Sequence, residues 1–300
     1  QKSVKAEFNQ KTLEFFKKYA SEWSIKAEDA GKTKVNVIKQ RNDYVTMVAN
    51  ELDNVNSFLD IGCGTGDLVG TIAKKNIKSI GVDFSEEMIE LANNKFSSLL
   101  KSYANFYCSS IFDFSMNNNH YDLISANGFI EYISMDQLDS LIDNVYNSLT
   151  PKGSFIVGSR NRLFNLASMN SFTLQEMKDN SLEHLLIEAV AWTNSKKISN
   201  MLTIDSAAYQ GSDLKHADTG IDVYTRFQYT PLQLINLLRQ RGFDVIEVYP
   251  INIHCMPPLF LNDNSEINAT IANLLQSISR NKSYFIPRSS SFMLHAKKAT

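Results

Sequence analysis

The chain has 300 residues, of which 43% are hydrophobic and 21% are charged, and its formal net charge is -2 at pH 7. The length allows one large domain or two small ones. No Lys/Arg block stands out and no apolar run reaches the length of a membrane span, so nucleic acid and membrane are not expected as partners. The three cysteines form no Cys-x-x-Cys pair, which predicts no metal site, no disulfide framework and a reduced, cytoplasmic setting.

Residues 5–53 are expected to be helical, because apolar side chains such as Phe8, Leu13 and Phe16 recur at roughly helical intervals. After them, strand and helix patterns alternate. The expected strands are 57–61, 78–82, 103–108, 121–126 and 153–159, and the expected helices are 66–75, 86–96 and 136–149. This alternation predicts a parallel sheet with right-handed crossovers.

Capping residues mark the helix starts. Ser85 suits the N-cap of the helix at 86–96, and Ser134 with Gln137 forms a capping box for the next one. The turn at 151–153 should then lead into the fifth strand. Beyond 160 the pattern changes: Thr173 and Glu176 predict another capping box, followed by an amphipathic helix that reaches residue 190.

The stretch 193–229 is polar and loop-like, as lids and binding loops often are. The α/β pattern returns with Thr230 and Pro231, an N-cap and first-turn proline, and with Gly242 as the residue that ends the helix. The expected elements are a helix at 231–241, a strand at 243–249, a helix at 265–279 and a last strand at 291–296.

A glycine-rich turn follows the first strand. Gly62, Gly64 and Gly66 stand at alternate positions, which allows a sharp bend and a close approach of a ligand to the main chain. The spacing differs from the G-x-G-x-x-G that places a pyrophosphate at a helix N-terminus, so a nicotinamide or flavin dinucleotide is not favoured. About 20 residues later the second strand ends at Asp83, where such folds place the acid that accepts hydrogen bonds from ribose hydroxyls.

The two motifs LDIGCGTG and GVDFSEEMIELA, in this order and at this distance, resemble those of class I S-adenosylmethionine (SAM)-dependent methyltransferases. The resemblance implies a Rossmann-like α/β fold, with a seven-stranded, mostly parallel sheet between helices and an antiparallel final strand. It divides the chain into an N-terminal helical lid (1–53), a SAM-binding core (54–159), a helical and loop insertion after strand five that caps the substrate (160–229), and the rest of the core sheet (230–300).

The resemblance also implies a cofactor site for SAM at the carboxyl ends of the strands. Arg41 would pair with the cofactor carboxylate, Asp83 with the ribose, and Asn127 would lie beside the sulfonium. The other implied cofactor residues are Asp60, Gly62, Cys63, Gly64, Gly66, Phe84, Met88, Ser109, Ser110 and Ile111. Cys63 is interpreted as packing within the turn. Many relatives have an Asp where Ser109 and Ser110 stand, so either Asp113 substitutes for it or the two serines merely end a strand.

Methyl transfer is an in-line displacement that needs no fixed catalytic signature, so the sequence says little about a base. His254, just after the sixth strand, is the best histidine candidate for the base, although a loop histidine without a catalytic task is the outcome favoured over it. Glu131 and Tyr132 follow strand four, in a stretch that lies beside the sulfonium and the substrate in similar enzymes. Tyr132 can position a substrate there or simply pack on the next helix. Tyr19, Arg160, Arg162, Tyr224 and Arg226 are the predicted substrate-binding residues, with ordinary surface charge as the alternative for the arginines.

The sequence therefore predicts a SAM-dependent methyltransferase that acts on an oxygen or nitrogen of a small molecule. Residues around Arg160 and Arg226 resemble bacterial enzymes that tailor sugars and surface polysaccharides, so a sugar or sugar nucleotide is one expected acceptor. The alternatives are a protein or RNA methyltransferase and a non-catalytic SAM-binding module. A homodimer is left open.

Overall fold

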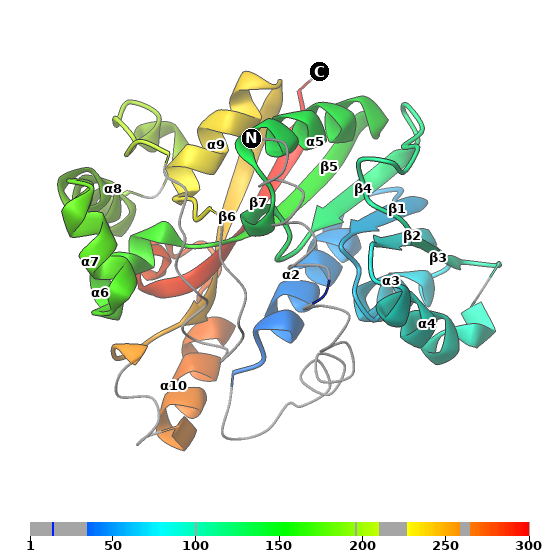
Figure 1. Ribbon diagram of the computed structural model, residues 1–300, viewed down its shortest axis with the longest axis horizontal. Helices are drawn as coiled ribbons and strands as arrows, with labels where there is room; N and C mark the ends of the chain where they lie inside the picture. Colours follow the sequence, from blue (N-terminus) through cyan, green and yellow to red (C-terminus); the bar gives the residue numbers. More distant parts are fainter. Residues whose placement is uncertain are drawn as a thin grey trace.

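The computed structural model describes residue 14 and residues 35–99, 101–195, 197–209, 227–258 and 265–299. In this part of the chain seven strands form one sheet in the order β3-β2-β1-β4-β5-β7-β6 (Figure 1). The strands are β1 (Ser57–Ile61), β2 (Lys78–Asp83), β3 (Ala104–Cys108), β4 (Tyr121–Ala126), β5 (Leu149–Arg160), β6 (Phe243–Ile253) and β7 (Ser289–Lys298). Strands β1 to β5 pair in parallel, and β7 pairs antiparallel with both β5 and β6. The expected seven-stranded, mostly parallel sheet is confirmed.

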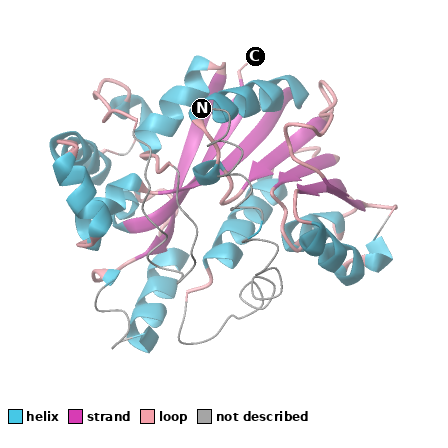
Figure 2. Ribbon diagram, viewed as in Figure 1, coloured by secondary structure: helices cyan, strands magenta, loops and turns pink. Residues whose placement is uncertain are grey.

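Helices cover both faces of the sheet (Figure 2). One face carries α2 (Val37–Glu51), α3 (Asp67–Ala73) and α4 (Glu86–Lys95), and the other carries α5 (Met135–Ser148) and α9 (Pro231–Gln240). The remaining described helices are α6 (Asn165–Ser168), α7 (Ser171–Lys178), α8 (Leu182–Asn194) and α10 (Ser265–Ser277), with 3-10 turns η1 (Ser97–Leu99), η2 (Ile130–Tyr132), η3 (Arg162–Phe164), η4 (Ile198–Met201) and η7 (Ser283–Arg288). This layering leaves the carboxyl ends of the parallel strands at one edge of the sheet.

The strands feed two separate hydrophobic cores, because successive side chains of a strand point to opposite faces. Phe155 and Val157 of β5 join the core under α5 and α9, whereas Ile156 joins the core under α2 and α3. In β7, Leu294 and Met293 divide in the same way. Central strands that are buried on both faces have continuous apolar sequences, and such runs are what made these strands predictable.

The caps predicted at Ser85, Ser134 and Thr230 are present. The Ser85 hydroxyl accepts a hydrogen bond from the Met88 N–H, and the boxes at Ser134 and Thr230 are complete. Gly242 ends α9 with a φ of 87°, in the left-handed region that glycine adopts easily. These local signals place the helix starts within a residue of their observed positions.

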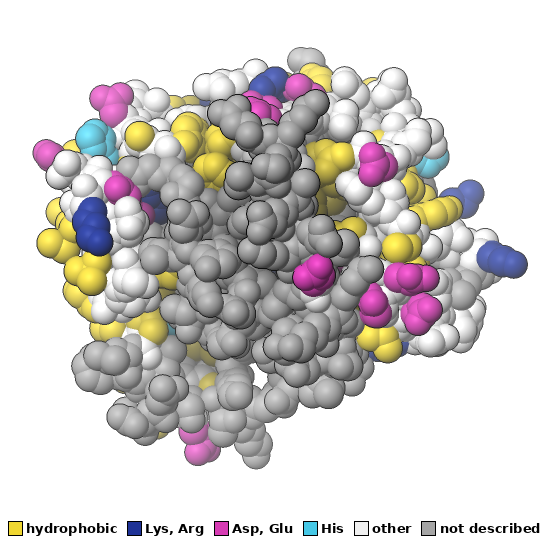
Figure 3. Space-filling model, viewed as in Figure 1, with side chains coloured by type: hydrophobic (Ala, Val, Ile, Leu, Met, Phe, Trp, Pro, Cys, Tyr) yellow, Lys and Arg dark blue, Asp and Glu magenta, His cyan; other side chains and the backbone are white. Residues whose placement is uncertain are grey.

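The predicted helix from 174 to 190 is wrong in its start and its continuity. Asn170, not Thr173, caps α7, and the chain turns at Asn180, where φ is 55°, before α8 begins. Leu174 and Leu186, expected to be buried, are exposed, and hydrophobic side chains gather on the surface over α7 and α8 (Figure 3). An apolar period that continued across the break suggested one helix where there are two.

Three other expectations differ in extent. Strand β6 continues to Ile253, beyond the predicted end at residue 249, because it pairs with β7 along its whole length. The turn expected at 151–153 lies inside the span of β5, with Lys152 at a φ of 70°. The loop expected from 193 contains the end of α8 and η4, while residues 210–226 and most of the expected lid, 1–13 and 15–34, lie outside the described residues.

Candidate functional site

The turn between β1 and α3 bends through three glycines with positive φ: Gly62 at 71°, Gly64 at 51° and Gly66 at 77°. The Gly62 N–H donates to the Val82 carbonyl oxygen at 2.8 Å, which holds the turn against β2. A Cβ on Gly66 would stand 2.5 Å from the Phe106 ring, so only glycine fits there. A Cβ on Gly64 would meet no atom within 4 Å. The turn therefore presents bare main chain to open space at the start of α3.

Asp83 ties this turn to the end of β2. Its Oδ2 accepts a hydrogen bond from the Gly64 N–H at 2.9 Å, and its Oδ1 accepts one from the Ser85 N–H at 2.9 Å. Burial raises the pKa of Asp83, and the main-chain donors act against that shift because they favour the charged form. The carboxylate thus lies against the glycine turn, where the sequence predicted the ribose-binding acid.

Asp60 is a buried carboxyl within the sheet itself. It lies opposite Ser125 in the pairing of β1 with β4, and the Ser125 hydroxyl donates to its Oδ1 at 2.6 Å. Burial raises the pKa of Asp60 to about 7; the Ser125 hydrogen bond opposes this rise, and the nearby Asp83 charge adds to it. This carboxyl therefore changes charge near neutral pH, beneath the glycine turn.

Arg41 reaches the same edge of the sheet from α2. Its Nη2 donates to the Ser291 hydroxyl of β7 at 2.8 Å, and its Nη1 occupies the space that a side chain on Gly128 would need. Burial lowers the pKa of the guanidinium, and the nearby carboxyl of Glu131 raises it. The Nε atom has no hydrogen-bond partner among the described residues. Arg41 is thus fixed beside the loop that follows β4.

That loop carries buried polar atoms without partners. Both side-chain polar atoms of Asn127, and Oε2 of Glu131, are buried and have no hydrogen-bond partner in the described part of the chain. Unpaired buried polar atoms are rare in native proteins, so each one calls for an explanation. SAM carries a carboxylate, an ammonium and ribose hydroxyls, and these groups match the unpaired atoms of Arg41 and Asn127 as well as the bare turn. The residues present therefore fit this cofactor.

The residues predicted for the adenine end cluster around the end of β3. Met88 and Ile111 are buried, and Phe84 is half-buried. The Ser109 hydroxyl donates to the Ser110 carbonyl oxygen, and the Ser110 hydroxyl accepts from the Phe112 N–H. Both hydroxyls thus serve the turn that ends the strand, which agrees with the strand-ending interpretation of these serines.

Arg160 and Arg162 have different surroundings. Arg160 ends β5, is buried, and has its guanidinium 5.8 Å from the centre of the Phe172 ring. Arg162 is also buried, and its Nε and Nη2 donate to the two carboxylate oxygens of Glu176 while Nη1 donates to the Ala208 carbonyl oxygen. The hydrogen bonds of Arg162 therefore connect η3 to α7 and to the residues near 208. Only Arg160 lies close to the charged groups of the site, since its charge acts on Glu131 and Arg41.

His254 follows β6, at the carboxyl edge as expected, but β6 is the outer strand of the sheet. Three strand spacings separate β6 from β4, which is about 14 Å. The His254 ring packs against Phe164 with the two ring centres 4.5 Å apart and the ring planes tilted by 32°. The structure does not bring His254 together with Asp83 and the glycine turn. Tyr132 is closer, in η2, and burial raises the pKa of its hydroxyl, which favours the neutral form.

Several residues of the site were not singled out from the sequence. Ser125 meets Asp60 across two paired strands, and Ser291 of β7 meets Arg41 of α2, so no local signal could have found them. Gly128 had a signal in the Asn-Gly step after strand four, since φ there is 62°. Cys63 was named and interpreted as packing, and a Cβ on Gly81 would indeed stand 2.7 Å from its sulfur atom.

Three predicted substrate residues, Tyr19, Tyr224 and Arg226, lie outside the described residues. Within the described ranges, no three His, Cys, Asp or Glu side chains stand together as a metal site. None of the helices in those ranges is long and apolar enough to cross a membrane.

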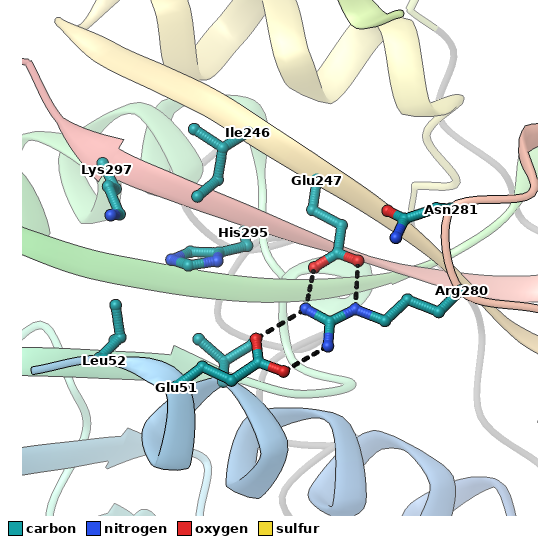
Figure 4. A pocket seen from close by; sticks show the side chains of 9 residues that line it. Glu51, Leu52, Ile246, Glu247, Arg280, Asn281, His295 and Lys297 are labelled. Carbon is teal, nitrogen blue, oxygen red and sulfur yellow. Dashed lines mark hydrogen bonds and ion pairs between the residues drawn. The ribbon is translucent and has the colours of Figure 1, made fainter. Parts of the chain in front are cut away.

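A second polar cluster lies near the amino ends of the strands, on the face covered by α2. It lines a cavity of about 290 Å³ between α2, β6 and β7 (Figure 4). Arg280 donates two hydrogen bonds to Glu51 and two to Glu247, and the Tyr44 hydroxyl also donates to Glu247. His295 of β7 borders the cavity, and its Nε2 is 2.8 Å from the Ser154 hydroxyl.

Comparison with known proteins agrees with this geometry. Residues 58–153 match a family described as a methyltransferase domain. A malonyl-[acyl-carrier protein] O-methyltransferase of Priestia megaterium is 34% identical over 102 residues, which are 33% of this chain and 35% of that protein. A carboxy-S-adenosyl-L-methionine synthase of Nautilia profundicola is 28% identical over 121 residues, 40% of this chain and 50% of that protein. The chain thus spans half or less of the length of these two relatives.

A solved structure extends the likeness to most of the chain. The magnesium protoporphyrin IX methyltransferase of Synechocystis PCC 6803, with bound S-adenosylhomocysteine (SAH), superimposes with a TM-score of 0.53. The match covers 97% of this chain and 100% of that one at 13% identity, so it speaks for the fold alone. Residues 58–153 thus match the methyltransferase domain family, and the chain has the fold of the class I SAM-dependent methyltransferases.

Proposed function

We propose that the chain is a SAM-dependent methyltransferase that transfers a methyl group to an oxygen or nitrogen of a small molecule. The observation that carries this proposal is the glycine turn, held by the Asp83 carboxylate, beside buried polar atoms of Asn127 and Arg41 that have no partner among the described residues. Partners for these atoms would come with a bound ligand, because leaving them unpaired costs free energy.

SAM, when bound, supplies a methyl group activated by the sulfonium. Asp83 would accept hydrogen bonds from the ribose hydroxyls, and Arg41 would hold the carboxylate with a charge-assisted hydrogen bond. Gly64 leaves the main chain open to the nucleoside. Asn127 offers one donor and one acceptor group at the end of β4. The main task of these residues is orientation, because a displacement needs the reacting atoms in line.

A small-molecule acceptor agrees with the net charge of -2, which gives no general attraction for nucleic acid. Arg160, buried at the end of β5, is a candidate contact for an anionic part of the acceptor. We keep a sugar or sugar nucleotide among the proposed acceptors, with less support than the sequence suggested, because Arg162 is engaged by Glu176. The matched relatives differ in chemistry, so they leave the acceptor open.

Two measurements test the proposal. Titration calorimetry should detect binding of both SAM and SAH, and Asp83→Ala should weaken the affinity about 10- to 100-fold because it removes a charged hydrogen-bond acceptor. Asp244→Ala, at an exposed carboxylate of β6, is the matched control and should leave the affinity unchanged.

A panel of sugar nucleotides, phenols, carboxylic acids and small amines should then yield SAH with at least one acceptor. Mass spectrometry of the nucleoside product distinguishes methyl transfer, which releases SAH, from formation of carboxy-SAM. Cofactor binding without turnover across the panel would favour a non-catalytic binding module instead.

A further inference from the structure

Glu131 lies on the acceptor side of the proposed cofactor site. The sheet reverses its order at β1, whose neighbours are β2 and β4, and ligands of open α/β sheets bind at such a switch point. The glycine turn follows β1 and Asp83 ends β2, so the nucleoside belongs over these strands. Glu131 follows β4, and Arg160 on β5 is among the charges that act on it. Beyond β4, the cofactor's reactive end would therefore face Glu131.

The carboxyl of Glu131 is buried and incompletely paired. The side chain is 2% exposed, and Oε2 has no partner among the described residues. Its main chain is held in place, since its carbonyl oxygen accepts the Phe227 N–H at 3.1 Å. Glu188, another buried carboxyl with an unpaired oxygen, differs because its Oε1 accepts two hydrogen bonds, from the Trp192 side chain and the Leu232 main chain. The hydrogen bonds of Glu188 therefore connect α8 to α9, whereas Oε2 of Glu131 makes no hydrogen bond to any described residue.

Burial and the neighbouring charges act on the Glu131 carboxyl in opposite directions. Burial raises the pKa of this carboxyl, and the guanidiniums of Arg41 and Arg160 act in the opposite direction. The charge of Glu131 also acts on the hydroxyls of Tyr132 and Tyr229, and burial raises the pKa of both, which favours their neutral forms. A carboxylate whose pKa is shifted toward neutral pH is a stronger base than an exposed one.

We propose that Glu131 is the proton acceptor of the methyl transfer and that the acceptor molecule carries a hydroxyl group. This inference rests on the proposed function. In the step, the acceptor oxygen forms a bond to the methyl carbon, and the bond from carbon to sulfur breaks with its electron pair moving to sulfur. The hydroxyl proton passes to Oε2 of Glu131, which becomes a neutral carboxylic acid. A neutral amine would need no such partner, so the buried unpaired oxygen points to an oxygen acceptor.

The test compares wild type with Glu131→Gln, which keeps the shape and removes the base, and with Glu188→Gln as the matched control for changing a buried carboxyl. With a hydroxyl acceptor returned by the panel, kcat of Glu131→Gln should fall about 10²- to 10⁴-fold. The dissociation constant for SAH should change less than about threefold, because Glu131 does not hold the cofactor. The wild-type kcat should rise with pH to a plateau, and Glu131→Gln should lack that rise.

Infrared spectroscopy of the SAH complex measures the protonation of the Glu131 carboxyl without any acceptor molecule. A carboxylic acid band that is absent from Glu131→Gln and present in Glu188→Gln should disappear as the pH rises, at a higher pH than for an exposed glutamic acid. Loss of SAH affinity in Glu131→Gln, a band that persists to high pH, equal turnover of the two variants, or a panel that returns only amines would each overturn the inference. Each of these outcomes leaves the proposed function standing, which fails only if no acceptor releases SAH.

Discussion

The polar groups at the two ends of the parallel strands are paired to different extents. Near the amino ends, Arg280 pairs with both Glu51 and Glu247, and every one of these charges has a partner from the chain itself. At the carboxyl ends, Asn127 and Glu131 have buried side-chain atoms that lack partners in the described residues. One end of the sheet therefore has a polar cluster whose charges are paired within the chain, and the other end has polar atoms that a ligand could pair.

The cluster at the amino ends has a structural role, and the cluster at the carboxyl ends belongs to the candidate binding site. The complete cluster connects α2 to β6 through Glu51 and Glu247, so its charges hold the helix on the sheet. The same helix carries Arg41 to the carboxyl edge, where Nε is unpaired in the described structure. A cavity of about 290 Å³ at the amino end is thus a weaker sign of a binding site than unpaired atoms at the other end.

The largest effect is expected in the glycine turn. Gly66→Ala places a Cβ 2.5 Å from the Phe106 ring at a positive φ, which should lower the free energy of unfolding by roughly 2–5 kcal/mol. Gly64→Ala meets no atom and should cost only about 1–2 kcal/mol for its φ, while still weakening SAH binding. Denaturant unfolding and calorimetry measure the two quantities. Equal stability of the two variants would contradict the tight packing at Gly66.

The pH dependence of stability should have opposite signs at the two ends. At the carboxyl end, the pKa of Asp60 is about 7 in the folded chain and 3.8 in the unfolded one. Between these values the folded state binds more protons, so stability falls as the pH rises through the window, by up to about 4 kcal/mol. Asp60→Asn should remove this fall. If the free energy of unfolding changes equally between pH 5 and pH 8 in wild type and in Asp60→Asn, the raised pKa of Asp60 is excluded.

At the amino end, burial lowers the pKa of His295 to about 4, from 6.5 in the unfolded chain. Between these values the unfolded state binds more protons, so stability falls as the pH drops below about 6.5, by up to about 3 kcal/mol. His295→Gln should be insensitive in this range while retaining a hydrogen bond to Ser154. An unchanged slope in the variant would assign acid sensitivity to another group.

The smallest effect is expected for the ion pairs of the cavity. Arg280→Gln removes the charge between Glu51 and Glu247, and since Arg280 and Glu51 are partly exposed, the loss of stability should be about 1 kcal/mol. The affinity for SAH should not change, because the cluster is closed on itself. A large loss of SAH affinity would instead show that the position of α2, and with it Arg41, depends on this contact.

Much of the fold could be predicted because its signals are local. Ser134 and Thr230 begin their helices through hydrogen bonds that reach only three residues, and the apolar strands are recognisable where both faces are buried. The helix predicted from residue 174 was wrong for the converse reason: apolar period alone does not reveal the turn at Asn180 or the exposure of Leu174. Burial depends on what packs on a helix, and no short stretch of sequence contains that information.

The sequence by itself determined the glycine turn, the position of Asp83 at the end of its strand, and the order of strands and helices, because each depends on neighbours along the chain. The tertiary structure alone decided which polar groups meet. It set Ser125 against Asp60 by strand pairing, paired Arg162 with Glu176, and placed His254 just after an outer strand. It also left an oxygen of Glu131 without a partner among the described residues, near two arginines that are distant in the chain and that only folding brings close.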